Sequence, residues 1–195
     1  MMQVLGGLQK GLVFVISAPA GTGKTTLTRM LCQEFACVTE SISYTTRSIR
    51  SGEVPGNDYY FIPQEEFKKK IMEGEFLEYA QVFSHYYGTS KIQVEAEQKR
   101  GKHVVLVIDT QGALQLMGTY PAVFIFIKPP SINELRRRLV ARKSDALDAI
   151  EQRLSWAEKE MSLANRYDYT IVNQDLDIAY SVLRSILIAE EHKNH

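Results

Sequence analysis

A glycine-rich segment near the start of the chain has the residue types of a phosphate-binding loop. Residues 17–26 read Ser-Ala-Pro-Ala-Gly-Thr-Gly-Lys-Thr-Thr and follow an apolar run at 12–16. Glycines at two of these positions let successive backbone N–H groups converge on phosphate oxygens at the start of a helix. Lys24 would reach the outer phosphates and the Thr25 hydroxyl would bind magnesium. We therefore predict a nucleoside triphosphate site; the alternative is a glycine-rich turn that happens to contain lysine.

A second candidate group, Asp109, follows the apolar run 104–108. Open α/β sheets bind ligands at the carboxyl ends of their strands, where a carboxylate can hold a magnesium-bound water or accept hydrogen bonds from a ligand. The residue alone leaves open a second interpretation, in which Asp109 caps a helix or forms a turn.

Arginines accompany the apolar stripes of two predicted helices. Arg138 and Arg142 flank the stripe of a helix at 131–142, and Arg153 flanks that of a helix at 146–164. Arginines beside a buried face need anionic partners, which are either phosphates or Asp and Glu side chains. The residues alone do not decide between the two.

The elements that must position these residues alternate along the chain. Continuous apolar runs at 12–16, 104–108, 123–127 and 169–172 predict strands buried on both faces. Predicted helices follow them at 24–34, 131–142, 146–164 and 176–190. This alternation predicts an α/β fold, a parallel sheet flanked by helices. We expect a single domain with a core at about 1–44, 92–130 and 156–195, an insert at about 45–91 and a lid at about 131–155.

Composition excludes several classes of protein. The 195 residues include 23 Lys and Arg against 23 Asp and Glu, so no global positive charge exists to hold nucleic acid or an acidic membrane. No run of about 20 apolar residues is present to cross a bilayer. The cysteines at 32 and 37 are too few for a disulfide framework, and the four histidines lack metal-ligand spacing. We expect a cytoplasmic protein with reduced cysteines.

Five further motifs complete a recognisable set. They read Ser41-Ile-Ser-Tyr-Thr-Thr-Arg-Ser-Ile-Arg-Ser-Gly-Glu53, Gly56-Asn-Asp-Tyr59, Phe76-Leu-Glu78, Tyr86-Tyr-Gly-Thr89 and Ile108-Asp-Thr-Gln-Gly112. Together with the phosphate loop they resemble guanylate kinases, in order and spacing, from about residue 12 to residue 190. The resemblance implies a P-loop NTPase-type fold with a GMP-binding insert and a short lid. It also implies transfer of the γ-phosphoryl group of ATP to GMP with Mg²⁺, with dGMP as a further acceptor.

The resemblance also implies roles for individual residues. The GMP phosphate would be held by Arg47, Arg50, Tyr59 and Tyr87. The guanine would face Ser43, Glu78, Thr89 and Asp109, with Asp109 also reaching Mg²⁺ through water. The transferring phosphoryl group would be attended by Lys24, Arg138, Arg142 and Arg153. The ATP-binding set would be Ala18, Pro19, Ala20, Gly21, Thr22, Gly23, Lys24, Thr25, Thr26 and Asn173, the last near the adenine.

Three positions depart from the family pattern, and two other functions compete. Val107 stands where an acid is usual, Ile49 where proline is common, and Lys143 where glycine often begins the lid loop. A phosphopeptide-binding module without catalysis is disfavoured by the intact phosphate loop, and a kinase for another nucleoside monophosphate is disfavoured by Glu78.

Aromatic residues leave further alternatives. Trp156 is expected to pack rather than to stack on a base. The tyrosines at 59, 60, 86 and 87 could all belong to the core of the insert, and only the family match favours two of them as ligands.

Overall fold

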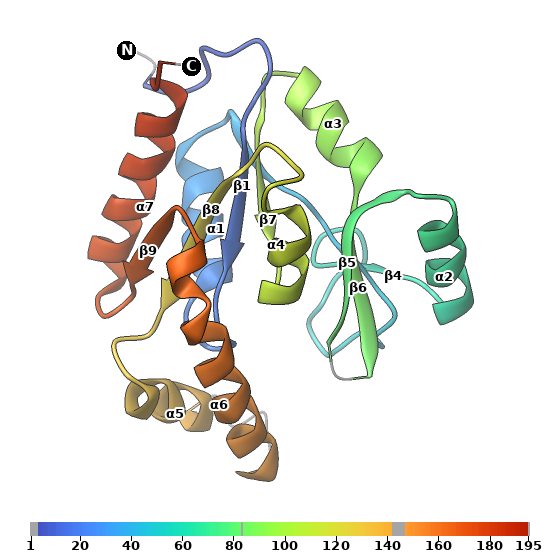
Figure 1. The fold of residues 1–195 in the computed structure, drawn as a ribbon, viewed down its shortest axis with the longest axis vertical. Helices are drawn as coiled ribbons and strands as arrows, with labels where there is room; N and C mark the ends of the chain where they lie inside the picture. The colour runs from blue at the N-terminus through green and yellow to red at the C-terminus, as the bar shows by residue number, and fades with distance from the viewer. Residues whose placement is uncertain (1–3, 83, 142–146, 195) are drawn as a thin grey trace.

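The central sheet is fully parallel. The computed structural model describes residues 4–82, 84–141 and 147–194, and Figure 1 shows how their elements are arranged. The sheet contains β1 (Val13–Ser17), β2 (Val38–Glu40), β7 (His103–Val107), β8 (Val123–Lys128) and β9 (Tyr169–Val172). Their order is β2-β7-β1-β8-β9, and every pairing is parallel. All four predicted strands lie in this sheet within one residue of their expected bounds; the short edge strand β2 was missed.

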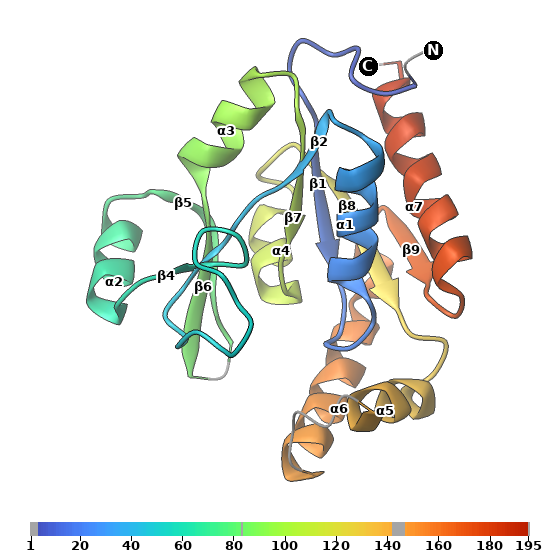
Figure 2. The ribbon, with the colours of Figure 1, turned by 180° about the vertical axis from the view of Figure 1, so that it is seen from behind.

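Helices cover both faces of this sheet. Phe14 and Ile16 of β1 pack with α1 (Lys24–Glu34) and α7 (Leu176–Glu191). Val13 and Val15, on the opposite face, pack with α3 (Lys91–Lys99) and α4 (Thr110–Leu116). Figure 2 shows α1 in front of the sheet. Since successive strand residues point to opposite faces, an apolar run without alternation buries both faces. The predicted α/β class is therefore confirmed.

A second sheet lies beside the first. It has the order β4-β3-β6-β5 and is built from β3 (Tyr44–Thr45), β4 (Tyr60–Phe61), β5 (Phe76–Val82) and β6 (His85–Ser90). α2 (Gln64–Met72) packs on it through the fully buried Phe67, whose ring stacks on Phe76 and Tyr86. This sheet occupies the stretch predicted as an insert. Its strands, together with α3 and α4, were not predicted because most are short and mix polar with apolar residues.

Two helices pack on each other beyond the carboxyl ends of the central strands (Figure 1). α5 (Ile132–Ala141) and α6 (Leu147–Ser162) share a small core that includes Leu135, Leu139 and Leu154. The 3₁₀ turn η1 (Ala164–Arg166) then leads to β9. Arg142, for which a role was predicted, and Lys143, which departs from the family pattern, lie outside the described residues. Within the described residues, no helix has the length and apolar character needed to span a bilayer.

Candidate active site

The phosphate loop joins β1 to α1 at the carboxyl edge of the sheet. Gly21 and Gly23 have positive φ angles of 93° and 95°, which favour glycine. A Cβ atom on Gly23 would lie 2.7 Å from the side-chain nitrogen of Asn173. That nitrogen donates a hydrogen bond of 2.7 Å to the carbonyl of Thr22. Asn173, which follows β9, thus supports the loop through its hydrogen bond to Thr22. Its contact with ATP remains a prediction.

Lys24 is the first residue of α1, and its ammonium donates to the carbonyl of Ala18 within the same loop. Because α1 begins at the loop, the positive end of its helix dipole faces the loop. The first turn of α1 contains no acidic residue that would neutralise this charge. Thr25 and Thr26 continue the helix with exposed hydroxyls. Backbone donors, an ammonium and hydroxyls therefore meet where an anion would bind.

A cavity of about 470 Å³ extends from this loop toward the second sheet and α6. Besides the loop residues 18–26, it is lined by predicted residues from six separate stretches of chain. These are Ser43, Arg47, Arg50, Tyr59, Glu78, Tyr87, Asp109 and Arg153. Three other predicted residues, Thr89, Asn173 and Arg138, do not line it.

Glu78 lines the cavity and is only 4% exposed. Its Oε1 accepts a hydrogen bond of 2.5 Å from the hydroxyl of Thr89. A Cβ atom at position 112 would lie 2.1 Å from Oε2, so only glycine allows α4 to approach this carboxyl group. Burial, reinforced by the charge of Asp109, raises the pKa of Glu78 to about 7. Thr89, although absent from the lining, thus holds Glu78 in place.

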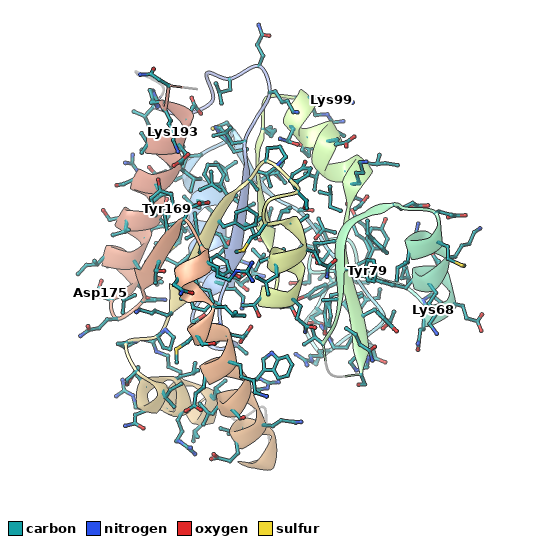
Figure 3. All side chains as sticks on the ribbon, in the orientation of Figure 1. Lys68, Tyr79, Lys99, Tyr169, Asp175 and Lys193 are labelled. Carbon is teal, nitrogen blue, oxygen red and sulfur yellow. The ribbon has the colours of Figure 1, made fainter. Side chains whose placement is uncertain are left out.

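The backbone beside Glu78 is tied to the central domain by Gln115 of α4. The side-chain amide of Gln115 accepts from the N–H of Tyr79 at 3.3 Å and donates to its carbonyl at 2.7 Å. Figure 3 labels Tyr79 on β5, the strand that also contains Glu78. The position of Glu78 therefore depends on β5 of the second sheet and on α4, which packs on the central sheet.

Asp109 combines the two roles between which the sequence could not decide. Its Oδ1 accepts the N–H of Gly112 at 2.8 Å and caps α4, and its Oδ2 accepts from the side chain of Gln111 at 3.2 Å. It also lines the cavity, and burial raises its pKa. Each oxygen already accepts one bond from the protein, which leaves a second lone pair on each for a ligand or water.

Arg47, which also lines the cavity, is 8% exposed and firmly held. Its two terminal nitrogens donate to the carboxylate of Glu53 at 3.0 and 2.6 Å, and Nη1 also donates to the carbonyl of Ser48 at 2.7 Å. The hydrogen bonds that Arg47 donates to Glu53 raise the pKa of Arg47. The Nε–H and one Nη2–H lie on the edge that Glu53 does not use, and together with the hydroxyl of Tyr87, which interacts with this guanidinium, they suit a phosphate group. Glu53 was not predicted as a site residue, although it lies in a quoted motif.

The tyrosines at 59, 60, 86 and 87 divide into two pairs. Tyr59 and Tyr87 line the cavity with ring centroids 5.9 Å apart. Tyr60 stacks on Tyr44, and Tyr86 stacks on Phe67 in the core of the insert. The sequence could not make this division, which follows from the register of β4 and β6.

The predicted arginines also differ in position. Arg153 lines the cavity, whereas Arg138 donates from Nε to Glu134 on its own helix at 2.9 Å. The sequence left open whether these arginines pair with phosphates or with acidic side chains. In this structure Arg138 pairs with an acidic side chain. Its contact with a transferring phosphoryl group remains a prediction.

Two lining residues on α6, Trp156 and Glu160, were missed as site residues. Trp156 is 37% exposed and lines the cavity, so it lies outside the buried core; the preference for packing over base stacking remains a prediction. Glu160 is 7% exposed, and burial raises its pKa to about 7. Both follow Arg153 at intervals of three and seven residues, which places all three on one helix face. That spacing is the signal that could have identified them.

The oxygen groups near the loop suit Mg²⁺. The hydroxyl of Thr25 and the carboxylate of Asp109 are hard ligands of the type that this ion prefers. The described residues contain no group of three or more His, Cys, Asp or Glu able to hold a metal alone. This donor set fits an ion that enters with nucleotide phosphates.

A phosphate loop at the carboxyl end of a central parallel strand defines a P-loop nucleotide-binding protein of the α/β class. A sequence profile described as guanylate kinase matches residues 10–190. The chain belongs to the guanylate kinase family.

Individual relatives cover almost the whole chain. A guanylate kinase of Protochlamydia amoebophila is 57% identical over 191 residues, 97% of each chain. One of Chlamydia pneumoniae is 51% identical over 183 residues, 93% of this chain and 89% of the relative. The crystal structure of a guanylate kinase from Anaplasma phagocytophilum superposes with a TM-score of 0.79 at 37% identity, covering 95% of this chain and 88% of that one.

Proposed function

We propose that this protein transfers the γ-phosphoryl group of ATP to GMP, giving ADP and GDP. The proposal is supported by its family and by a cavity that joins a triphosphate loop to a second set of polar groups. The observation that carries the choice of GMP is Glu78, a buried acceptor whose second oxygen remains available in the cavity.

Glu78 favours guanine over adenine for a physical reason. An ionised carboxylate can accept both the N1–H and the exocyclic N2–H of guanine, and adenine offers no such pair. A buried acceptor left without a donor costs about 1–3 kcal/mol, and more when it is charged. The hydroxyl of Thr89 orients Glu78, and Ser43 and Asp109 complete the subsite that we assign to the base.

The GMP phosphate is assigned to Arg47, Arg50, Tyr59 and Tyr87. Glu53 occupies one edge of the Arg47 guanidinium, so that its remaining donors form a fork for phosphate oxygens. The backbone N–H of Arg50 also donates to Glu53, at 2.8 Å, which ties the two arginines to one carboxylate. This arrangement fixes the direction from which the acceptor phosphate is presented.

The reaction needs alignment more than acid–base chemistry. The nucleophile is an oxygen of the GMP phosphate that is already ionised, so no residue has to remove a proton. The new bond forms from this oxygen to the γ-phosphorus as the bond to the bridging oxygen of ADP breaks. We assign Lys24 to the outer phosphates of ATP, and Arg153, Arg138 and Arg142 to the charge of the transferring group.

We place Mg²⁺ next to the hydroxyl of Thr25, with Asp109 acting through a water molecule. When bound with ATP, the ion neutralises charge on the phosphates. Residues 18–26 would surround the triphosphate chain and hold it by their backbone N–H groups, except at Pro19, which has none. We also propose the cytoplasm as its compartment, consistent with the free thiols of Cys32 and Cys37.

A panel of acceptors tests this function. Purified protein is mixed with ATP, Mg²⁺ and either GMP, dGMP, AMP or UMP, and ADP formation is measured. The rate of phosphoryl transfer should be much higher with GMP than with AMP or UMP. Transfer to dGMP should also be detectable. Equal rates with all four acceptors would contradict the guanine site, and ATP binding without any transfer would favour a non-catalytic module.

A further inference from the structure

Glu160 is a buried carboxylate for which the function described so far has no use. It lies near the end of α6, is 7% exposed, and lines the same cavity as the phosphate loop. Among the residues that the structure describes, none donates a hydrogen bond to it; only burial and the charges of Lys24 and Asp109 act on its pKa. A buried carboxylate in a folded protein normally has such partners.

A neighbouring polar group is also unsatisfied. The hydroxyl of Tyr167, which follows η1, is buried; the side chain of Ser17 interacts with it, but no described residue reaches it within full hydrogen-bond geometry. The charges of Glu160 and Asp109 both act on this hydroxyl, which places the three groups together. Buried polar groups without partners at one place indicate that water or an ion completes the site.

The other carboxylates of the cavity are already engaged. Glu78 accepts from Thr89, and both oxygens of Asp109 accept bonds from the start of α4. β7, the strand that ends at the site, presents the apolar Val107 to the cavity. Among the described lining residues, Glu160 is therefore the carboxylate with both oxygens still available.

Position and charge indicate what Glu160 accepts. Lys24 acts on Glu160 as a favourable charge, so the carboxylate is near the place assigned to the outer phosphates. A carboxylate cannot donate to phosphate oxygens when it is ionised, but it accepts hydrogen bonds from water. Mg²⁺ keeps several water molecules when it binds with nucleotide phosphates.

We propose that Glu160 is a positioning residue for magnesium–ATP, whose carboxylate accepts hydrogen bonds from the water shell of the ion. This inference rests on the proposed use of Mg²⁺ with ATP. Glu160 would orient those water molecules from α6. Its removal should therefore weaken the coupling between Mg²⁺ and ATP and leave the binding of ATP without the ion intact.

The test measures that coupling in binding experiments. ATP is titrated into the wild type and Glu160→Gln, first in EDTA and then in excess Mg²⁺. Trp156, the single tryptophan of the sequence, lines the cavity and supplies a fluorescence signal, and calorimetry gives an independent value. Glu158→Gln, an exposed position on the same helix, is the matched control.

We expect Mg²⁺ to raise the affinity of the wild type for ATP, and Glu160→Gln to lower this factor about 10-fold or more, as removal of outer-shell partners of metals does. The affinity in EDTA should stay the same or increase, because a negative charge near the phosphates is lost. Glu158→Gln should match the wild type, and Glu160→Asp, which keeps the carboxylate, should recover part of the coupling.

Three results would overturn the inference. If Glu160→Gln lowers ATP affinity equally with and without Mg²⁺, Glu160 acts by orienting Lys24 and not through the water shell of the ion. Unchanged coupling with a shifted thermal midpoint would assign it a structural role alone. A wild type whose ATP affinity ignores Mg²⁺ would remove the proposed metal use as well, and this outcome is visible before any variant is made.

Discussion

At the scale of single residues, the site depends on side chains that are held by others. Glu78 is oriented by Thr89, and Arg47 is oriented by Glu53. Such supporting groups fix the rotamers of the residues that would touch GMP, so that binding loses less side-chain entropy. Substitutions of the supporting residues should therefore affect GMP and leave ATP largely unaffected.

The raised pKa of Glu78 predicts a pH dependence of GMP binding. The pKa is about 7, above the usual value of 4.5, and guanine requires the ionised form. Binding therefore releases a proton, so the affinity for GMP should rise with pH, as the ionised fraction grows from about 10% at pH 6 to about 90% at pH 8. Calorimetric titration of GMP across this range measures the effect.

Glu78→Gln is the control for this titration. The GMP phosphate ionises near pH 6 whichever protein is used, so its contribution to the pH dependence of GMP affinity should remain in the variant. The increase in affinity above about pH 6, which comes from Glu78, should disappear. The glutamine amide also presents N–H donors toward guanine donors, so GMP binding should weaken much more than ATP binding. Equal loss for both nucleotides would contradict the assigned role.

Gly112→Ala should displace the carboxyl group of Glu78. The added Cβ would lie 2.1 Å from Oε2 and 2.9 Å from Cδ of Glu78, so one of the two must move. We expect the KM for GMP to rise about tenfold or more, which corresponds to about 1.4 kcal/mol. The affinity for ATP measured in the same variant is the control, and an unchanged KM for GMP would show that the approach is not required.

Glu53→Gln should loosen Arg47. A glutamine cannot accept two charge-assisted bonds from the guanidinium, so its orientation toward phosphate would no longer be fixed. Steady-state kinetics should show about a tenfold rise in the KM for GMP with little change for ATP. Glu65→Gln, exposed on α2, is the control and should behave as the wild type.

At the scale of elements, the site lies where the ends of strands meet neighbouring helices. β1 supplies the loop, β7 leads to Asp109 and β5 supplies Glu78. The contact between α4 and β5 joins the two sheets at this point through Gln115 and Tyr79. These two hydrogen bonds help to set the distance between Glu78 and the phosphate loop.

Gln115→Ala tests this junction. The loss of two partly exposed hydrogen bonds should lower the free energy of unfolding by about 1 kcal/mol, measured by urea denaturation. The KM for GMP should rise, because β5 is no longer fixed to α4. Gln64→Ala on the exposed face of α2 is the control; a variant equal to it in both measurements would show that other contacts hold the junction.

At the scale of the whole molecule, the cavity is bounded by three parts of the chain: the central sheet, the insert with the second sheet, and α6. The ion pair between Arg29 of α1 and Asp58 of the insert, at 3.4 Å, is exposed and therefore weak. Arg138 is paired with Glu134 and must leave it to reach a phosphoryl group. These observations favour relative movement of the parts during the reaction.

We predict closure of the insert and the lid when both nucleotides bind. Closure would exclude water, which otherwise competes with GMP for the phosphoryl group. Small-angle scattering with a bisubstrate analogue should give a smaller radius of gyration than the protein alone. An unchanged radius would count against closure.

The sequence by itself determined the parallel sheet, the phosphate loop and most of the lining residues. Long apolar runs fix strands locally, and the spacing of glycines, lysine and threonine fixes the loop within ten residues. The resemblance to a family supplied Glu78, Arg47 and their neighbours. These features depend on short-range spacing, which a single sequence contains.

Only the tertiary structure decided which polar groups meet. Glu53 beside Arg47, Gly112 against Glu78, and Glu160 in the same cavity as Lys24 depend on register, close approach and helix direction. The exposure of Trp156 and the division of the four tyrosines also follow from packing. The physical reason is that burial and pairing arise between residues far apart in the chain, for which local spacing carries no information.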